Sequence, residues 1–145
     1  MQIDPAKLRD FATRYTAAWC SQDPASVAAF FSSEASLTVN SGTPAVGRSE
    51  ITDLARSFMT TFPDLKIVMD DLLVHVDYAE YHWTLMGTNT GPGGTGHRVR
   101  ISGFEKWRIG HDGLIASSQG HFDAAEYRRQ LEQGREGECD RQFGS

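Results

Sequence analysis

The chain has 145 residues, the length of one average domain, and its 39% hydrophobic and 23% charged residues are ordinary for a folded globular protein. Its formal net charge is -5, from 14 basic and 19 acidic residues, and no cluster of lysine or arginine stands out, which argues against a nucleic-acid partner or an anionic membrane surface. No apolar run approaches the roughly 18 residues that a membrane-spanning helix needs, so no membrane partner is expected.

The first predicted helix begins at Asp4 and Pro5, because aspartate is a favoured N-cap and proline fits the first helical position. Apolar residues then recur at helical spacing over roughly four turns. They are Leu8, Phe11, Ala12, Tyr15, Ala18 and Trp19. The sequence therefore predicts a helix with one apolar stripe.

A second, shorter helix starts with the same signal at Asp23 and Pro24. Its apolar stripe consists of Val27, Phe30 and Phe31. A strand is predicted from Ala35 to Asn40, where apolar and polar residues alternate. After a GTPAVG loop, a third helix is predicted from about Ser49 to Thr61.

After Pro63 the apolar period changes from about 3.6 to 2, which predicts strands. Four strand candidates follow: Leu65–Val76, Tyr78–Asn89, Arg98–Ile109 and Leu114–Asp123. Their short, turn-like connections imply antiparallel neighbours. A last helix, Ala124–Leu131, leads to a polar segment, residues 134–145, that we expect to be a frayed tail. This order predicts a single α+β domain over residues 1–133, with about three N-terminal helices packed on a mostly antiparallel sheet.

The two cysteines, Cys20 and Cys139, have no Cys or His neighbour at zinc-site spacing and are too few for a disulfide framework, so no metal is expected. The glycine-rich segment GPGGTG lacks the following helix and the Lys-Ser/Thr pair of a phosphate loop, so it is interpreted as a hairpin turn. The N-terminal segment MQIDPAKLRD contains neither the basic nor the apolar region of a secretion signal, and the expected location is cytoplasmic.

The strand Arg98–Ile109 has two different faces. One set of alternate residues is apolar or small apart from a single carboxylate, and the other contains four cations. The first set is Val99, Ile101, Gly103, Glu105, Trp107 and Ile109. Glu105 should therefore face the helices, where desolvation would raise its pKa and suit it to proton transfer. The alternative is a structural ion pair, or a hydrogen bond to Tyr15 or Tyr81.

In the last strand, neither set of alternate residues is wholly apolar. One set is Ile115, Ser117, Gln119, His121 and Asp123, and the other is Leu114, Ala116, Ser118, Gly120 and Phe122. Polar groups on the helix side would need buried partners or a cavity that binds a small molecule. His121 and Asp123 share a face and could form a pair, the alternative being a half-buried histidine satisfied by the backbone. Asp123 is also well placed to cap the helix that follows it.

Three segments together resemble the nuclear transport factor 2-like superfamily and, within it, the SnoaL-like polyketide cyclase group. They are WTLMGTNTGPGGTG, SGFEKWRI and DGLIASSQGHFDAAEYRRQL, and the resemblance extends over roughly Leu8 to Leu131. It implies a cone-shaped roll, in which a strongly curved sheet wraps around the helices and an apolar pocket opens at one end. It also implies a homodimer formed through the outer face of the sheet, an apolar small-molecule ligand, and no metal or organic cofactor.

The resemblance implies roles for individual residues. Asp123 matches the aspartate that acts as acid and base in the cyclases, whereas Asn89 stands where the cyclases commonly carry a histidine. An asparagine can polarise an oxygen but cannot exchange a proton. Aromatic residues at core spacing are interpreted as core, and in this fold part of their ring surface also lines the pocket. The expected ligand contacts are Tyr15, Trp19, Phe58, Trp83, Asn89 and Trp107. His82 directly precedes Trp83 in the predicted strand, so it points to the opposite face and is assigned to the outer face of the sheet.

The predicted function is that of a cofactor-independent small-molecule enzyme, since activities in the group include polyketide cyclisation, ketosteroid isomerisation, dehydration and epoxide hydrolysis. Asp123 and Glu105 would move a proton on an apolar oxygenated substrate, with His121 as a third catalytic candidate. The alternative is a non-catalytic domain that binds a small ligand in the same pocket.

Overall fold

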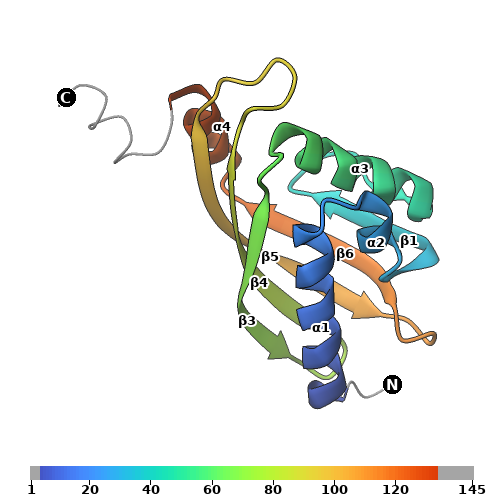
Figure 1. Ribbon diagram of the computed structural model, residues 1–145. Helices are drawn as coiled ribbons and strands as arrows, with labels where there is room; N and C mark the ends of the chain where they lie inside the picture. Colours follow the sequence, from blue (N-terminus) through green and yellow to red (C-terminus); the bar gives the residue numbers. More distant parts are fainter. Residues whose placement is uncertain (1–3, 134–145) are drawn as a thin grey trace.

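The protein is described by a computed structural model, which covers residues 4–133. Within these residues, three helices lie on one side of a curved six-stranded sheet and a fourth lies at one end (Figure 1). The helices are α1 (Pro5–Cys20), α2 (Pro24–Ala28), α3 (Gly47–Thr61) and α4 (Ala124–Gln133). The strands are β1 (Phe31–Val39), β2 (Ala45–Val46), β3 (Lys66–Val74), β4 (Ala79–Thr88), β5 (Arg98–Ile109) and β6 (Ile115–Phe122). The predicted α+β class is confirmed, and the predicted tail, residues 134–145, lies outside the described residues.

Both helix starts predicted from Asp-Pro pairs are confirmed. The Asp4 carboxylate accepts hydrogen bonds from the backbone N–H groups of Ala6 at 3.0 Å and Lys7 at 3.4 Å. The Asp23 carboxylate accepts one from the N–H of Ala25 at 3.2 Å. These bonds satisfy N–H groups of the first helical turn that have no partner within the helix.

Helix α2 is shorter than predicted, because it ends at Ala28 and Phe31 already belongs to β1. The backbone carbonyl of Phe30 accepts a hydrogen bond from the N–H of Ile115 in β6 at 2.9 Å. Strand pairing therefore replaces helical hydrogen bonding at this point. The prediction that Phe30 and Phe31 extend the helical stripe is wrong, although Phe31 is fully buried and Phe30 packs against the core.

The strand order of the sheet is β2–β1–β6–β5–β4–β3. The four predicted strands form an antiparallel meander from β3 to β6, and β5 has its predicted bounds. Strand β1 lies parallel to β6, with Leu37 opposite Ser118, so the sheet is mixed. Strand β2 lies in the segment predicted as a loop and pairs antiparallel with β1 over two residues. Two residues are too few to produce an alternating pattern in the sequence.

The core lies between the helices and the face of the sheet that they cover, which we call the inner face. In β5 the residues buried on this face are Val99, Ile101, Glu105 and Trp107, and the four cations of the opposite set are exposed. The predicted inward orientation of Glu105 is therefore confirmed. It follows from burial, since only one face of the strand can be covered by the helices.

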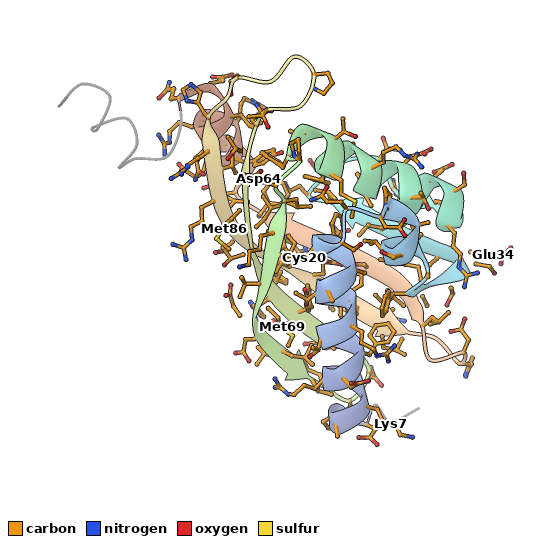
Figure 2. All side chains as sticks on the ribbon, viewed as in Figure 1. Lys7, Cys20, Glu34, Asp64, Met69 and Met86 are labelled. Atoms are coloured by element: carbon orange, nitrogen blue, oxygen red, sulfur yellow. The ribbon has the colours of Figure 1, made fainter. Side chains whose placement is uncertain are left out.

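Two side chains form hydrogen bonds from helices to backbone groups of the sheet. The Cys20 thiol at the end of α1 donates to the carbonyl oxygen of Ile67 in β3 and accepts from its N–H, both at 3.3 Å (Figure 2). The buried Gln130 of α4 accepts a hydrogen bond from the N–H of Arg100 in β5 at 2.7 Å. Helix α4 is thereby held against the beginning of β5. Among residues 4–133, no helix is long and apolar enough to cross a membrane.

Candidate functional site

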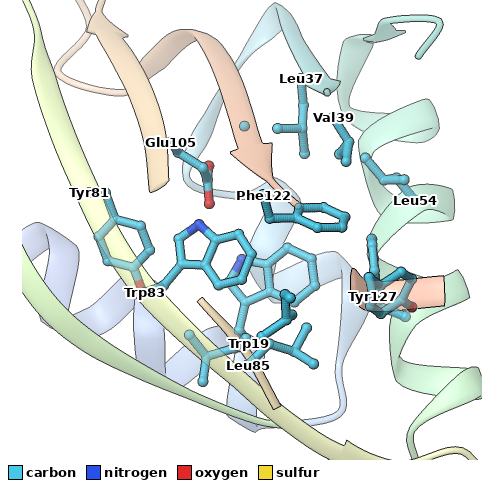
Figure 3. A pocket seen from close by; sticks show the side chains of 14 residues that line it. Trp19, Leu37, Val39, Leu54, Tyr81, Trp83, Leu85, Glu105, Phe122 and Tyr127 are labelled. Atoms are coloured by element: carbon cyan, nitrogen blue, oxygen red, sulfur yellow. The ribbon is translucent and has the colours of Figure 1, made fainter. Parts of the chain in front are cut away.

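A cavity of about 60 Å³ lies between the helices and the inner face of the sheet (Figure 3). Residues from three helices and five strands line it. They are Trp19, Leu37, Val39, Leu54, Phe58, Ile67, Tyr81, Trp83, Leu85, Ile101, Glu105, Gly120, Phe122 and Tyr127. Among these described lining residues, Glu105 is the one carboxylate in otherwise apolar or aromatic surroundings.

The residues that line the cavity differ in exposure. Five of them are half-buried, and we call these the rim: Val39, Leu54, Phe58, Phe122 and Tyr127. The other lining residues are buried. The rings of Phe122 and Tyr127 pack edge to face, with centroids 5.4 Å apart. Ligand pockets usually measure about 300–1,000 Å³. A ring-sized ligand would therefore enter only when rim side chains move.

The Glu105 carboxyl group is held by three neutral donors. Its Oε1 accepts hydrogen bonds from the Ser118 hydroxyl at 2.7 Å and the Trp107 indole N–H at 3.1 Å. The Tyr15 hydroxyl lies 3.0 Å from Oε1 and 3.2 Å from Oε2. Oε1 therefore carries most of the hydrogen bonds, and Oε2 keeps lone-pair capacity for another partner. Of the alternatives considered for Glu105, the hydrogen bond to Tyr15 is confirmed.

Burial dominates the electrostatics of this group. Glu105 is 8% exposed, and its burial raises the pKa of the carboxyl above the ordinary range, while the hydrogen bonds from Ser118, Trp107 and Tyr15 oppose the rise. Burial and the nearby Glu105 charge also raise the pKa of Tyr15 well above its usual value, so its hydroxyl stays a donor at neutral pH. A buried carboxyl group with a raised pKa is suited to exchange a proton with a bound molecule.

Three of the predicted ligand contacts line the cavity: Trp19, Phe58 and Trp83. Tyr15 and Trp107 do not line it. They lie behind Glu105, packed against each other at a centroid distance of 5.2 Å, and they act on the cavity only by holding the carboxyl group. Both residues hold the carboxyl group in place, and their role as direct ligand contacts remains a prediction.

Asn89 is buried, yet it does not line the cavity. Strand β4 ends at Thr88, and the chain then turns away. The Asn89 side chain donates to the Thr95 hydroxyl at 3.1 Å, and its backbone carbonyl accepts from the N–H of Gly96 at 2.8 Å. Asn89 thus stabilises the loop that joins β4 to β5, and its expected contact with a ligand remains a prediction.

His121 and Asp123 do not lie in the cavity either. His121 is exposed on the outer face of the sheet, where its ring packs on Phe104 at a centroid distance of 5.0 Å. The His82 ring packs on the other side of Phe104 at 5.3 Å, which confirms the outer position of His82. Asp123 is exposed, and its carboxylate accepts a hydrogen bond from the N–H of Glu126 at 3.0 Å. The capping alternative is confirmed for Asp123. Neither His121 nor Asp123 lines this cavity, and their catalytic roles remain predictions.

Ser118 is the main site residue that the sequence analysis did not single out. It makes the shortest hydrogen bond to Glu105, and it lies in β6 opposite Trp107. The signal for it is the pairing of the last two strands, because residues opposite inward-facing positions also face inward. Within residues 4–133, no group of three or more His, Cys, Asp or Glu side chains is placed to hold a metal ion.

Comparisons with known proteins agree with this fold. The chain resembles the structure of TsrD from Streptomyces laurentii, with 25% identity, a TM-score of 0.77, and coverage of 90% of this chain and 98% of TsrD. It also resembles a hypothetical protein with a ketosteroid isomerase-like fold from Catenulispora acidiphila DSM 44928, solved in complex with trimethylamine. The identity is 15% and the TM-score 0.75, and the match covers 84% of this chain and 92% of that one. A third similar structure is SalBIII, described as an epoxide hydrolase/cyclase-like enzyme with a role in pyran ring formation in salinomycin. The identity is 16% and the TM-score 0.74, and the match covers 85% of this chain and 95% of SalBIII.

Among curated proteins, none matches the chain. The model of the SnoaL-like polyketide cyclase family, however, matches residues 9–131, which include all the cavity-lining side chains. The architecture, with helices packed on a curved sheet around an apolar cavity, is that of the nuclear transport factor 2-like superfamily. The chain therefore belongs to the SnoaL-like polyketide cyclase family.

Proposed function

We propose that the protein is a cofactor-independent enzyme in which Glu105 transfers a proton on an apolar substrate that carries a carbonyl group. The observation that carries this proposal is the environment of Glu105, a buried carboxyl group at the wall of an apolar cavity with neutral donors around it. The raised pKa of such a group makes it a stronger base than an ordinary carboxylate.

The reaction would begin with Glu105 ionised. Oε2 takes a proton from the carbon next to the substrate carbonyl, and the electron pair of the C–H bond becomes part of an enolate. The carboxyl group is then neutral, which relieves the cost of a buried charge. It can return the proton to a different carbon, as in an isomerisation, or to an oxygen after aldol bond formation or loss of hydroxide. Tyr15, Trp107 and Ser118 keep the carboxyl group in one orientation throughout.

The cavity supports an apolar substrate more strongly than a charged one. Apart from Glu105, the described lining offers hydrocarbon and aromatic surface, and a second buried charge would be poorly solvated there. The family supports the general chemistry, and among the structural relatives SalBIII is described as epoxide hydrolase/cyclase-like. Polyketide-type cyclisation, isomerisation and dehydration all share the proton transfer that we assign to Glu105.

Hydrogen–deuterium exchange tests this proposal without knowledge of the natural substrate. Cyclohexanone in D₂O loses its α-hydrogens to solvent only when a base removes them, and proton NMR follows the loss directly. The protein should accelerate the exchange, and Glu105→Gln should abolish the acceleration, because glutamine keeps the shape of the side chain but cannot take the proton.

Asp123→Asn is the matched control, since it removes a carboxylate that lies outside the cavity and leaves a residue that still caps helices. It should exchange the ketone at the wild-type rate. Loss of exchange in Asp123→Asn with full exchange in Glu105→Gln would refute the assignment. Binding of the ketone without any acceleration would favour the alternative function, a small-ligand-binding domain that uses the same cavity.

A further inference from the structure

The indole nitrogen of Trp83 has no hydrogen-bond partner, although the residue is only 9% exposed. Among the buried side-chain nitrogen and oxygen atoms of residues 4–133, this nitrogen is alone in that respect. Buried polar groups are nearly always paired, because an unpaired one loses its hydration without compensation. Trp83 lines the cavity, so a molecule bound there could supply the missing partner.

The other tryptophan beside Glu105, Trp107, has an indole N–H that is hydrogen-bonded. Trp107 also projects from the inner face, and its indole N–H donates to Glu105 Oε1 at 3.1 Å. Trp83 lies on the neighbouring strand and makes no such bond to the carboxyl group. The two indoles therefore differ in hydrogen bonding: the Trp107 N–H is paired within the protein, whereas the Trp83 N–H is unpaired.

The packing of Trp83 restricts rotation of its ring. Gly103 lies opposite Trp83 on β5, and a Cβ atom at position 103 would be 2.8 Å from Cζ2 of the indole. The ring thus rests directly against the glycine backbone. On another side the Phe122 ring packs against it, with centroids 5.9 Å apart. The contact with the β5 backbone does not involve the rim, and it restricts the direction of the indole N–H before any ligand binds.

That direction leads toward Glu105. Because Trp83 is opposite Gly103, it is a diagonal neighbour of Glu105 on the same face of the sheet. Figure 3 shows the indole nitrogen on the ring edge that points toward the Glu105 carboxyl group. An atom bound to this N–H would consequently lie close to the oxygen that we expect to move the proton.

We infer that the Trp83 indole N–H binds the carbonyl oxygen of the substrate and so selects for ketones over hydrocarbons and cationic molecules of the same shape. An indole N–H can only donate, so its partner must be an acceptor. The inference rests on the proposed function and deepens it: the carbonyl oxygen at Trp83 places the neighbouring carbon at Glu105. As the proton leaves that carbon, negative charge grows on the oxygen, where a fixed donor in an apolar cavity stabilises it.

The test compares cyclohexanone with methylenecyclohexane, in which a CH₂ group replaces the carbonyl oxygen. In ¹⁵N-labelled protein, the indole N–H signal of Trp83, assigned with Trp83→Phe, should move downfield on addition of cyclohexanone. It should not do so with methylenecyclohexane. Trp83→Phe should weaken cyclohexanone binding by roughly 2- to 12-fold more than methylenecyclohexane binding, the range expected for one neutral hydrogen bond.

The hydrocarbon probe controls for packing, since a smaller ring at position 83 affects both probes alike. If Trp83→Phe does not fold, 3-benzothienylalanine at this position keeps the ring shape and removes only the N–H. An unmoved Trp83 signal in cyclohexanone, or an equal loss of affinity for both probes, would overturn the inference.

The outcomes also separate this inference from the proposed function. In Glu105→Gln, the downfield movement of the Trp83 signal should persist, because the variant leaves the indole in place. A Trp83 signal that moves, with no deuterium exchange of the ketone in the wild type, refutes only the assignment to Glu105. Exchange that depends on Glu105 while the Trp83 signal does not move refutes only the role of Trp83.

Discussion

Gly103→Ala should destabilise the protein through the contacts of a single added methyl group. The new Cβ would lie 2.3 Å from the backbone oxygen of His121 and 2.8 Å from Cζ2 of Trp83. The first of these atoms belongs to the paired backbone of β6 and cannot move alone. Overpacking of this kind typically costs about 1–3 kcal/mol of unfolding free energy.

Gly120→Ala is the matched control, because Gly120 is also an inner-face glycine in a central strand. There the added Cβ would meet Thr38 O at 3.5 Å and Glu105 Cγ at 3.8 Å, which are ordinary contacts. The change also restricts the unfolded chain, an effect worth about 0.4–1 kcal/mol in favour of the folded state. We expect this variant to be as stable as the wild type or slightly more stable.

Urea denaturation followed by tryptophan fluorescence measures both variants under the same conditions. Gly103→Ala should unfold at a lower urea concentration than Gly120→Ala, and it should also move the indole signal of Trp83 in the ligand-free protein. Equal midpoints for the two variants would refute the close approach of Trp83 to the β5 backbone. The fixed direction of the Trp83 N–H depends on that approach.

Two further predictions concern the protonation of Glu105. Ser118→Ala removes a donor that lowers the pKa of Glu105, so the titration of the carboxyl group, followed by ¹³C NMR, should move to higher pH. The control Ser117→Ala changes a residue on the opposite face of β6 and should leave the titration in place. A movement to lower pH in Ser118→Ala would contradict the hydrogen bond from Ser118 to Glu105. Glu105→Gln should change how stability depends on pH. Because burial raises the folded-state pKa above the unfolded value, the Glu105 contribution is most favourable below the unfolded pKa and declines as pH rises through the folded pKa. The variant should therefore gain stability relative to the wild type as pH rises from the unfolded-state pKa of Glu105 through its raised folded-state pKa. The gain is about 1.4 kcal/mol for each tenfold difference in proton affinity between the two states. A stability difference in urea denaturation that stays constant with pH would contradict the raised pKa.

The orientation of β5 could be predicted from the sequence because its two faces differ completely. Apolar residues and one carboxylate alternate with four cations, and only the first set can be buried without a large cost in desolvation. The starts of α1 and α2 were equally predictable, since the capping bonds of Asp4 and Asp23 involve only residues within the first helical turn.

Strand β6 shows where the local pattern is insufficient. Ile115 and His121 belong to the same alternating set, yet Ile115 is buried and His121 is exposed on the outer face. The register with β5 shifts between Ile109, opposite Ile115, and Arg108, opposite Ser117. Such an irregularity changes which set of residues faces inward, and alternation counted along the strand does not reveal it. This shift places Ser118, and not His121, beside Glu105.

The sequence by itself determined the class of the fold, most strand positions and the burial of one carboxylate, because each depends on a pattern within a single element. The tertiary structure decided what surrounds that carboxylate. Trp107 comes from β5 itself, Ser118 reaches Glu105 because β6 pairs with β5, and Tyr15 reaches it because α1 packs on the sheet. The unpaired N–H of Trp83 has the same origin, since a missing partner is defined only once every neighbouring element is in place.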